Sequence, residues 1–195
     1  MTYDYRVATL ARVPTPHQAL ATHLRGASAE VVGQFAPQLG WANNQAAVLF
    51  RGEGVLDAPG LVVDVTSESL TPTLRPADDA LPQSGGIYVH RWFEVDADAA
   101  DAFVELSGQG WKRFEAQFAA QIFGLFRAAP SPADAAAGVQ RLLLITRYAD
   151  HGVWEASRDP TSEAMQIFAR RQQLTRRTWA ASTLLVRSAQ QEIQR

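Results

Sequence analysis

The segment "GGIYVHRWFEVD", residues 85–96, constrains the fold more than any other part of the chain. Its β-branched and aromatic residues are typical of a strand, in which successive side chains point to opposite faces. One face carries Tyr88, His90, Trp92 and Glu94, and the other carries Ile87, Val89, Arg91 and Phe93. A sheet with one wet face would show a cleaner alternation of apolar and polar residues. We therefore expect a strand that is covered by protein on both faces.

The composition is that of a folded protein, because 47% of the 195 residues are hydrophobic and five are tryptophan. The net charge of -2 provides no basic surface, so a nucleic acid is not expected as a partner. No apolar run approaches the ~20 residues that span a bilayer, and the first residues do not resemble a signal peptide. The expected location is therefore cytoplasmic, without a membrane partner. The absence of cysteine excludes disulfides, thiolate metal sites and a cysteine nucleophile.

The order of predicted elements is repeated along the chain. The first pass reads as a strand over residues 2–13, a helix over 14–35 and short strands within 39–65. The second pass has strands at 87–95, 121–128, 141–149 and 178–188, a helix over 96–119, a second helical region over 152–177, and a Pro/Ala-rich surface insertion at 128–138. The second pass has the order βαββαβ, which is typical of a ferredoxin-like unit.

Two sequence matches support a duplication. "YDYR" at residues 3–6 matches "YVHR" at 88–91, an offset of 85, and "FAPQLGW" from Phe35 resembles "FAAQIFGLF" from Phe118. We predict a first repeat over residues 1–80 with a reduced second helix, and a complete repeat over 81–195. The polar segment "TPTLRPADDALPQSGG" is the predicted linker between them.

Several motifs of the second repeat resemble the NIPSNAP group of the dimeric α/β-barrel superfamily. They are "YVHRWFEVD", an acid-started helix after it, a strand that ends in "TRYAD" and a helix that begins "HGVWEASR". The matching positions are Tyr88, Arg91, Tyr148, Asp150 and Trp154. The resemblance implies an α+β fold in which tandem ferredoxin-like repeats pack their antiparallel sheets as an intrachain dimeric α/β barrel.

His90 is the candidate catalytic residue, because an imidazole between Tyr88 and Trp92 could move a proton beside an aromatic ligand. The alternative is a core histidine that bonds to a neighbouring strand or to Glu94. Arg91 also has two interpretations. With its counterpart Arg6 it could clamp a carboxylate, or it could take part in a buried ion pair that joins the two halves.

The helix over 96–119 predicts a pocket against the sheet. Phe103, Ser107, Gly110 and Phe114 share one face, and the small residues leave room for either a closely approaching backbone or a pocket floor. Trp111 and Trp154 are the candidate aromatic walls, and either tryptophan could instead belong to the core. Tyr88, Arg91, Trp92, Trp111, Phe114 and Trp154 are therefore the predicted ligand-binding residues.

No metal or cofactor is expected. His17 and His23 do not have a metal-ligand spacing, and the glycine-containing segments lack the context of a phosphate loop. Serine nucleophile signatures are also absent. Some relatives in the barrel superfamily place Asn, Trp and His in one pocket, but here Asn43 and Asn44 lie in the first half and His90 in the second.

The sequence thus predicts a protein that binds a small hydrophobic or aromatic molecule. One interpretation is a monooxygenase or isomerase that acts on such a compound. The alternative is a noncatalytic module for ligand binding or protein interaction, since a fold alone does not imply a function. Formation of a homodimer is left open.

Overall fold

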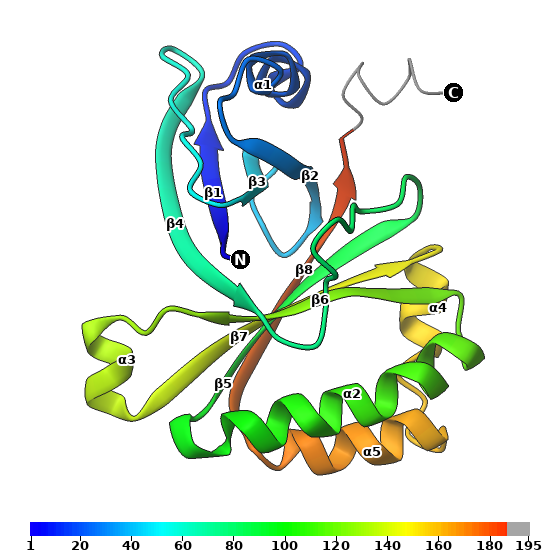
Figure 1. The fold of residues 1–195 in the computed structure, drawn as a ribbon. Coiled ribbons are helices and arrows are strands. Elements are labelled where there is room, and N and C mark those ends of the chain that lie inside the picture. Colours follow the sequence, from blue (N-terminus) through cyan, green and yellow to red (C-terminus); the bar gives the residue numbers. More distant parts are fainter. Residues whose placement is uncertain (187–195) are drawn as a thin grey trace.

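The computed structural model describes residues 1–186, and in this part of the chain eight strands form one closed antiparallel barrel (Figure 1). The strands are β1 (Tyr3–Leu10), β2 (Glu30–Leu39), β3 (Gln45–Arg51), β4 (Val62–Pro72), β5 (Ile87–Asp96), β6 (Ala120–Ala128), β7 (Val139–Tyr148) and β8 (Thr175–Leu185). The helices are α1 (Pro16–Leu24), the short 3-10 helix η1 (Ala97–Ala99), α2 (Ala100–Gln117), α3 (Pro132–Ala137), α4 (His151–Ala156) and α5 (Glu163–Gln172).

The strand order repeats once around the barrel, as β1-β3-β2-β8-β5-β7-β6-β4. Within each half the order is that of a ferredoxin-like unit, and β1 and β5 hold equivalent places. The halves join where β2 pairs with β8 and where β4 pairs with β6. A twofold rotation that exchanges the two halves also exchanges these two junctions. The order of the strands therefore has approximate twofold symmetry. The expected α+β barrel within one chain is confirmed.

Both faces of β5 are covered, as its sequence predicts. Its inward side chains join a barrel core that is largely aromatic, and its outward side chains pack beneath helices. The inward set of β5 is Tyr88, His90 and Trp92, and the outward apolar set is Ile87, Val89, Phe93 and Val95. The bulk on both faces is therefore explained by two separate cores.

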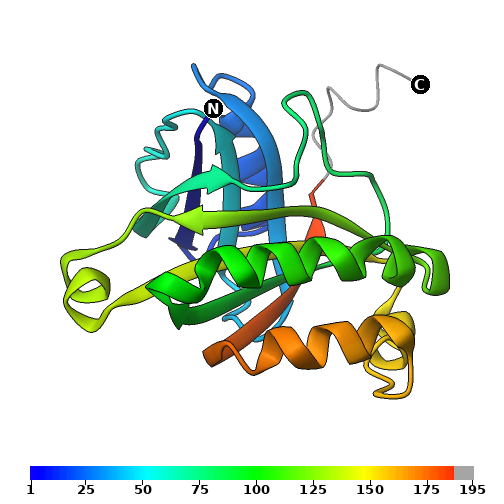
Figure 2. The same ribbon diagram turned by 60° about the horizontal axis from the view of Figure 1, so that its bottom comes forward.

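The helices α2 and α5 run side by side across the outer face of the second half's sheet (Figures 1 and 2). Phe103, Phe114 and Phe168 contribute to the core between these helices and the sheet. The first half has the single helix α1 on its outer face, where Leu20 and Leu24 pack on Val48 and Phe50 in a smaller cluster.

The predicted helix over residues 14–35 is wrong in its second part. Helix α1 ends at Leu24, and Glu30–Leu39 is strand β2. Val31 and Val32 favour a strand, and they serve different cores because Val32 packs inside the barrel while Val31 packs toward α1. Residues 52–61, between β3 and β4, contain no helix.

The second half departs less from the prediction. The insertion at 128–138 is mostly exposed and contains α3, which begins with a capping box between Ser131 and Asp134. The helical region predicted over 152–177 divides into α4 and α5, and β8 begins at Thr175. Residues 187 and 188 of the predicted last strand lie outside the described residues.

The predicted linker covers one mouth of the barrel. Arg51 of β3 donates to the backbone carbonyls of Asp78 and Ala80, and the hydroxyl of Tyr88 donates to the carbonyl of Gln83 at 2.6 Å. These bonds hold the segment against the ends of strands from both halves.

An ion pair joins the halves near the opposite mouth. Arg141 of β7 donates through Nη1 and Nη2 to the carboxylate of Glu68 on β4, at 2.6 and 2.8 Å, and through Nε to Asp134 at 3.0 Å. The Arg141 side chain is only 17% exposed, and its guanidinium lies over the ring of Trp92. Such a bidentate pair fixes geometry better than a surface ion pair does.

We expect Arg141→Gln to lower the free energy of unfolding by about 2 kcal/mol, because it leaves two carboxylates without their shared partner. Urea unfolding followed by circular dichroism measures this loss. The matched control is Arg127→Gln, which removes an ion pair to Asp101, whose side chain is 91% exposed, and should change stability by less than about 0.5 kcal/mol. Equal effects of the two variants would contradict the proposed bridging role of Arg141.

Candidate functional site

His90 lies in the middle of the barrel core and is 1% exposed. The Tyr5 hydroxyl is 2.9 Å from its Nδ1, and the Thr183 hydroxyl is 3.1 Å from its Nε2. The Thr183 hydroxyl also donates to the carbonyl of Tyr88 at 3.2 Å. Because that hydroxyl has a single proton, it accepts from Nε2–H, and Nδ1 accepts from Tyr5. The ring is thus held as one neutral tautomer.

Burial lowers the pKa of His90 to about 3, because no carboxylate compensates for the lost hydration of the imidazolium. The rings of Phe35 and Trp41 pack against it at centroid distances of 4.7 and 5.5 Å. The structure therefore has the features of the core-histidine interpretation, with strand partners in place of Glu94. The catalytic role of His90 stays a prediction.

A different cavity lies outside the barrel, between its sheet and the helices of the second half. We call it the helix–sheet pocket. Its volume is about 480 Å³. Its lining consists of Val89, Arg91, Trp111, Phe114, Ile122, Leu144, Thr146, Tyr148, Trp154, Ser157, Arg158, Pro160, Met165, Phe168, Ala169, Arg171, Gln172 and Thr178. Aromatic and aliphatic walls with a few polar groups are typical of a small-molecule site.

The structure divides the predicted ligand-binding residues between the two faces of the sheet. Arg91, Trp111, Phe114 and Trp154 line the helix–sheet pocket, whereas Tyr88 and Trp92 point into the barrel with His90. The alternation of side chains along β5 makes this separation unavoidable. A single site therefore cannot contain all of these residues.

Two arginines of the helix–sheet pocket, the half-buried Arg91 and the buried Arg171, make no ion pair among the described residues. Burial lowers the pKa of Arg91. Burial, together with the positive charge of Arg91, lowers the pKa of Arg171 to about 9. Arg6, the counterpart of Arg91, pairs with Asp4 on its own strand at 2.8 Å. The predicted ion pair between the halves through these arginines is therefore wrong, and Arg141 has that role instead.

Two further hydrogen-bond donors at this pocket have no acceptor in the described part of the chain. They are the buried indole Nε1 atoms of Trp111 and Trp154. Buried polar groups are normally paired, and each unpaired one costs about 1–3 kcal/mol. The pocket thus has unused donors in addition to unbalanced positive charge.

The room predicted at Gly110 is occupied by a side chain. A Cβ atom at this position would lie 2.4 Å from Cε1 of Phe168, so the glycine allows α5 to pack closely on α2. The predicted backbone contact and the predicted pocket floor are both wrong in detail. The floor is instead formed by outward side chains of the sheet, including Val89, Leu144 and Thr146.

Sequence reasoning did not select Arg171 as a site residue, although a signal was present. Arg171 follows Ala164 and Phe168 by seven and three residues, which places it on the same apolar stripe of α5. A charged residue on a buried stripe is unusual, and it indicates either a partner or a binding role. Arg158 at the rim gave no comparable signal.

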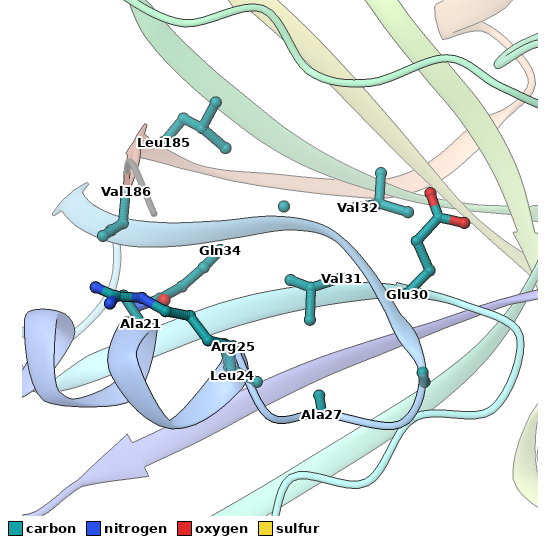
Figure 3. A pocket seen from close by; sticks show the side chains of 12 residues that line it. Ala21, Leu24, Arg25, Ala27, Glu30, Val31, Val32, Gln34, Leu185 and Val186 are labelled. Carbon is teal, nitrogen blue, oxygen red and sulfur yellow. The ribbon is translucent and has the colours of Figure 1, made fainter. Parts of the chain in front are cut away.

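A second cavity, of about 360 Å³, lies between α1 and β2 in the first half (Figure 3). Val31 and Gln34 lie on the α1 side of β2, while Val32 lies on the other side. Gln34 donates to the carbonyl of His17 at 2.8 Å, and Glu30 pairs with Arg51. Because these polar groups already have partners, this cavity is a weaker candidate for a ligand-binding site.

The linker-covered mouth of the barrel contains a larger and more open cavity of about 680 Å³. Its arginines are also satisfied, since Arg75 pairs with Glu115 and Arg147 donates to the carbonyl of Gly85. Among the three cavities, the helix–sheet pocket is the one with buried, unbalanced charge.

Residues 1–186 contain no cluster of three or more His, Cys, Asp or Glu residues that could hold a metal ion. Asn44 donates to the carbonyl of Leu10, and the carbonyl of Asn43 is bonded to His17, so neither asparagine joins His90. None of the helices in the same residues combines the length and the apolar content that a membrane crossing requires.

The buried His90 predicts a specific loss of stability in acid. The unfolded chain takes up a proton on this ring below its ordinary pKa of 6.5, whereas the folded protein does so only near 3. The neutral His90 therefore contributes fully to the free energy of unfolding above pH 6.5, and this contribution is lost as the pH falls toward 3. The loss between pH 7 and pH 5 is about 2 kcal/mol.

We expect the double variant Tyr5→Phe, His90→Phe to lose this component, because it removes both the titrating ring and its hydroxyl partner. Urea unfolding at a series of pH values measures the difference from the unmodified protein. His23→Gln, at an exposed histidine, is the control and should keep the full pH dependence. An unchanged pH dependence in the double variant would show that His90 is not the group responsible.

Comparison with known proteins gives structural matches alone. No protein-family model matches the chain, and no curated protein matches it in sequence. A protein of Fusobacterium nucleatum subsp. nucleatum, provisionally described as a monooxygenase, is 9% identical with a TM-score of 0.61 over 95% of this chain and 92% of its own. An anthrone oxidase-like protein is 12% identical with a TM-score of 0.62, over 95% and 91%.

A protein described as a major regulator of staphylococcal pathogenesis has a TM-score of 0.62 at 10% identity, and the match covers 96% of this chain and all of that one. At these identities the likeness shows the fold and not the activity. The chain thus has the dimeric α/β-barrel fold over nearly its full length, with both halves of the barrel supplied by one polypeptide.

Proposed function

We propose that the protein binds a small hydrophobic or aromatic molecule in the helix–sheet pocket. The observation that carries this proposal is a cavity of about 480 Å³ whose walls include Trp111, Phe114 and Trp154. Its size lies within the range of small-molecule sites, and its lining mixes aromatic surface with a few convergent polar groups.

The geometry favours ligand binding over a defined reaction. Among the described residues that line the pocket there is no histidine, aspartate or glutamate, which are the usual general bases. Tyr148 is present, but burial raises the pKa of its hydroxyl, with the nearby Arg91 opposing that rise. The noncatalytic interpretation therefore has direct support from the residues.

A monooxygenase is the second candidate, and the fold likeness to a provisionally described monooxygenase and an anthrone oxidase-like protein favours it. Positive charge in the pocket could stabilise an anion formed from a bound substrate. An isomerase would need a proton-transferring group, and Tyr148 contributes a phenolic hydroxyl to the lining. Native mass spectrometry of freshly purified protein would identify a retained molecule, and oxygen uptake with that molecule would favour the monooxygenase.

Membership of the NIPSNAP group is part of the proposal. Among the matched residues, Arg91, Tyr148 and Trp154 line the helix–sheet pocket, while Asp150 caps α4 by accepting from the backbone of Val153. Residues that are far apart in sequence thus converge on one site, which supports a functional origin of the resemblance.

Binding can be tested with the neutral fluorescent probe N-phenyl-1-naphthylamine. We expect fluorescence enhancement with the unmodified protein, and a loss of affinity of about tenfold or more in Thr146→Phe, because a ring at this buried lining position fills the cavity. Fluorescence titration of each protein measures the affinities.

The control is Ala27→Phe, which places the same ring in the cavity beside α1 and should leave probe affinity unchanged. Circular dichroism verifies that both variants are folded. Failure of the probe to bind, or equal loss in the two folded variants, would contradict the assignment of the helix–sheet pocket as the binding site.

A further inference from the structure

We propose that the ligand of the helix–sheet pocket is an organic carboxylate, held by Arg91 and Arg171, with the indole N–H groups of Trp111 and Trp154 as additional donors. This inference rests on the proposed binding function and adds the chemical class of the ligand. It is drawn from positive charges and N–H donors at this pocket that have no ion-pair or hydrogen-bond partner within residues 1–186.

The first argument is the charge of the lining. Arg91, Arg158 and Arg171 contribute three guanidinium groups, and no aspartate or glutamate accompanies them among the lining residues. Burying a charge without a partner costs several kcal/mol, and two like charges in one cavity add mutual repulsion. An anion placed between Arg91 and Arg171 would remove both penalties.

The second argument is independent of charge. The Nε1 atoms of Trp111 and Trp154 are buried donors without acceptors, although Trp111 is only 3% exposed. A carboxylate has two oxygens that accept about four hydrogen bonds, and it suits the fork of a guanidinium. A neutral aromatic hydrocarbon would pack against the apolar walls but would leave these N–H donors without an acceptor.

The surroundings of the two arginines give them different roles. The Cζ atom of Arg171 lies 4.5 Å from the ring centroid of Phe168 and about as close to two other phenylalanine rings, and its Nη1 is 3.4 Å from the Ser107 hydroxyl. Aromatic faces can support a buried cation without a carboxylate. Arg91 has no such support and makes no side-chain hydrogen bond within residues 1–186, so it is the principal carboxylate contact.

The apolar remainder of the ligand follows from the same geometry. Phe114 contacts both Tyr148 and Phe168 through its ring, and Trp154 lies beside Tyr148. These rings form a wall beside the arginines. The pocket therefore fits an amphipathic acid with an aromatic or aliphatic body, in preference to a small inorganic anion.

The test compares 2-naphthoate with 2-naphthamide, which share the naphthalene body and differ in charge. Each compound displaces N-phenyl-1-naphthylamine from the unmodified protein, from Arg91→Met and from Arg91→Lys. We expect naphthoate to bind about tenfold or more tightly than naphthamide, and Arg91→Met to remove most of this difference while leaving the affinity for the naphthamide within about twofold. Arg91→Lys should retain part of the difference, because it keeps the charge and loses the fork.

Thermal unfolding without ligand separates binding from a structural role. Removing an uncompensated buried charge should leave the Tm of Arg91→Met unchanged or higher, whereas removing a structural partner would lower it. The matched control is Arg25→Met, at an exposed arginine of the cavity beside α1, which should preserve the preference for naphthoate. Should Arg91→Met fail to fold, Arg91→Gln removes the same charge and provides the comparison.

The outcomes distinguish this inference from the proposed function. Binding of both compounds without a preference for naphthoate, or a preference that survives in folded Arg91→Met, would overturn the carboxylate assignment and leave the pocket as a hydrophobic site. If neither compound displaces the probe, and the probe itself does not depend on Thr146, the binding function and the carboxylate assignment fail together.

Discussion

The hydrogen bond between Tyr5 and His90 joins equivalent positions of β1 and β5 in the centre of the barrel. These residues are 85 positions apart, which is also the offset between "YDYR" and "YVHR". Equivalent residues of two halves meet only near the axis that relates the halves. The barrel core is therefore organised around a polar contact, and the aromatic rings of Phe35, Trp41 and Trp92 exclude water from it.

Barrel closure determines where a ligand can bind. The interior is filled by large side chains, among them Tyr3, Tyr5, Tyr88 and Phe126, and an eight-stranded barrel has little room beyond that. A pocket must then form at a mouth or beneath the helices. Because side chains alternate along β5, Arg91 is directed beneath the helices by the same strand geometry that places His90 inside.

The sequence contained enough information for the architecture and for part of the site. Bulk on both faces of residues 87–95 predicted a strand covered on both sides, the repeated motif predicted two related halves, and the family resemblance implied that the halves form one barrel. The sequence also predicted which side chains of β5 share a face. Which core or pocket each face meets depends on tertiary contacts that the sequence does not display. Gly110 shows the limit, because its lack of a side chain indicated close packing without identifying Phe168 as the neighbour. The boundary of α1 was missed although Gly26, just after the end of α1, is a helix stop signal and Val31 and Val32 favour a strand.

The two halves differ in their helical cover, and this difference explains why the charged pocket lies in the second half. In the first half, β3 connects to β4 without a helix, and Val63 on β4 is 69% exposed. In the second half, α5 packs on α2 through the close contact at Gly110. This packing places Arg171 of α5 in the same pocket as Arg91. The equivalent Arg6 has an aspartate two residues away on its own strand. Arg91 has Val89 at the corresponding position, so its charge has no partner there, which supports the proposed carboxylate site.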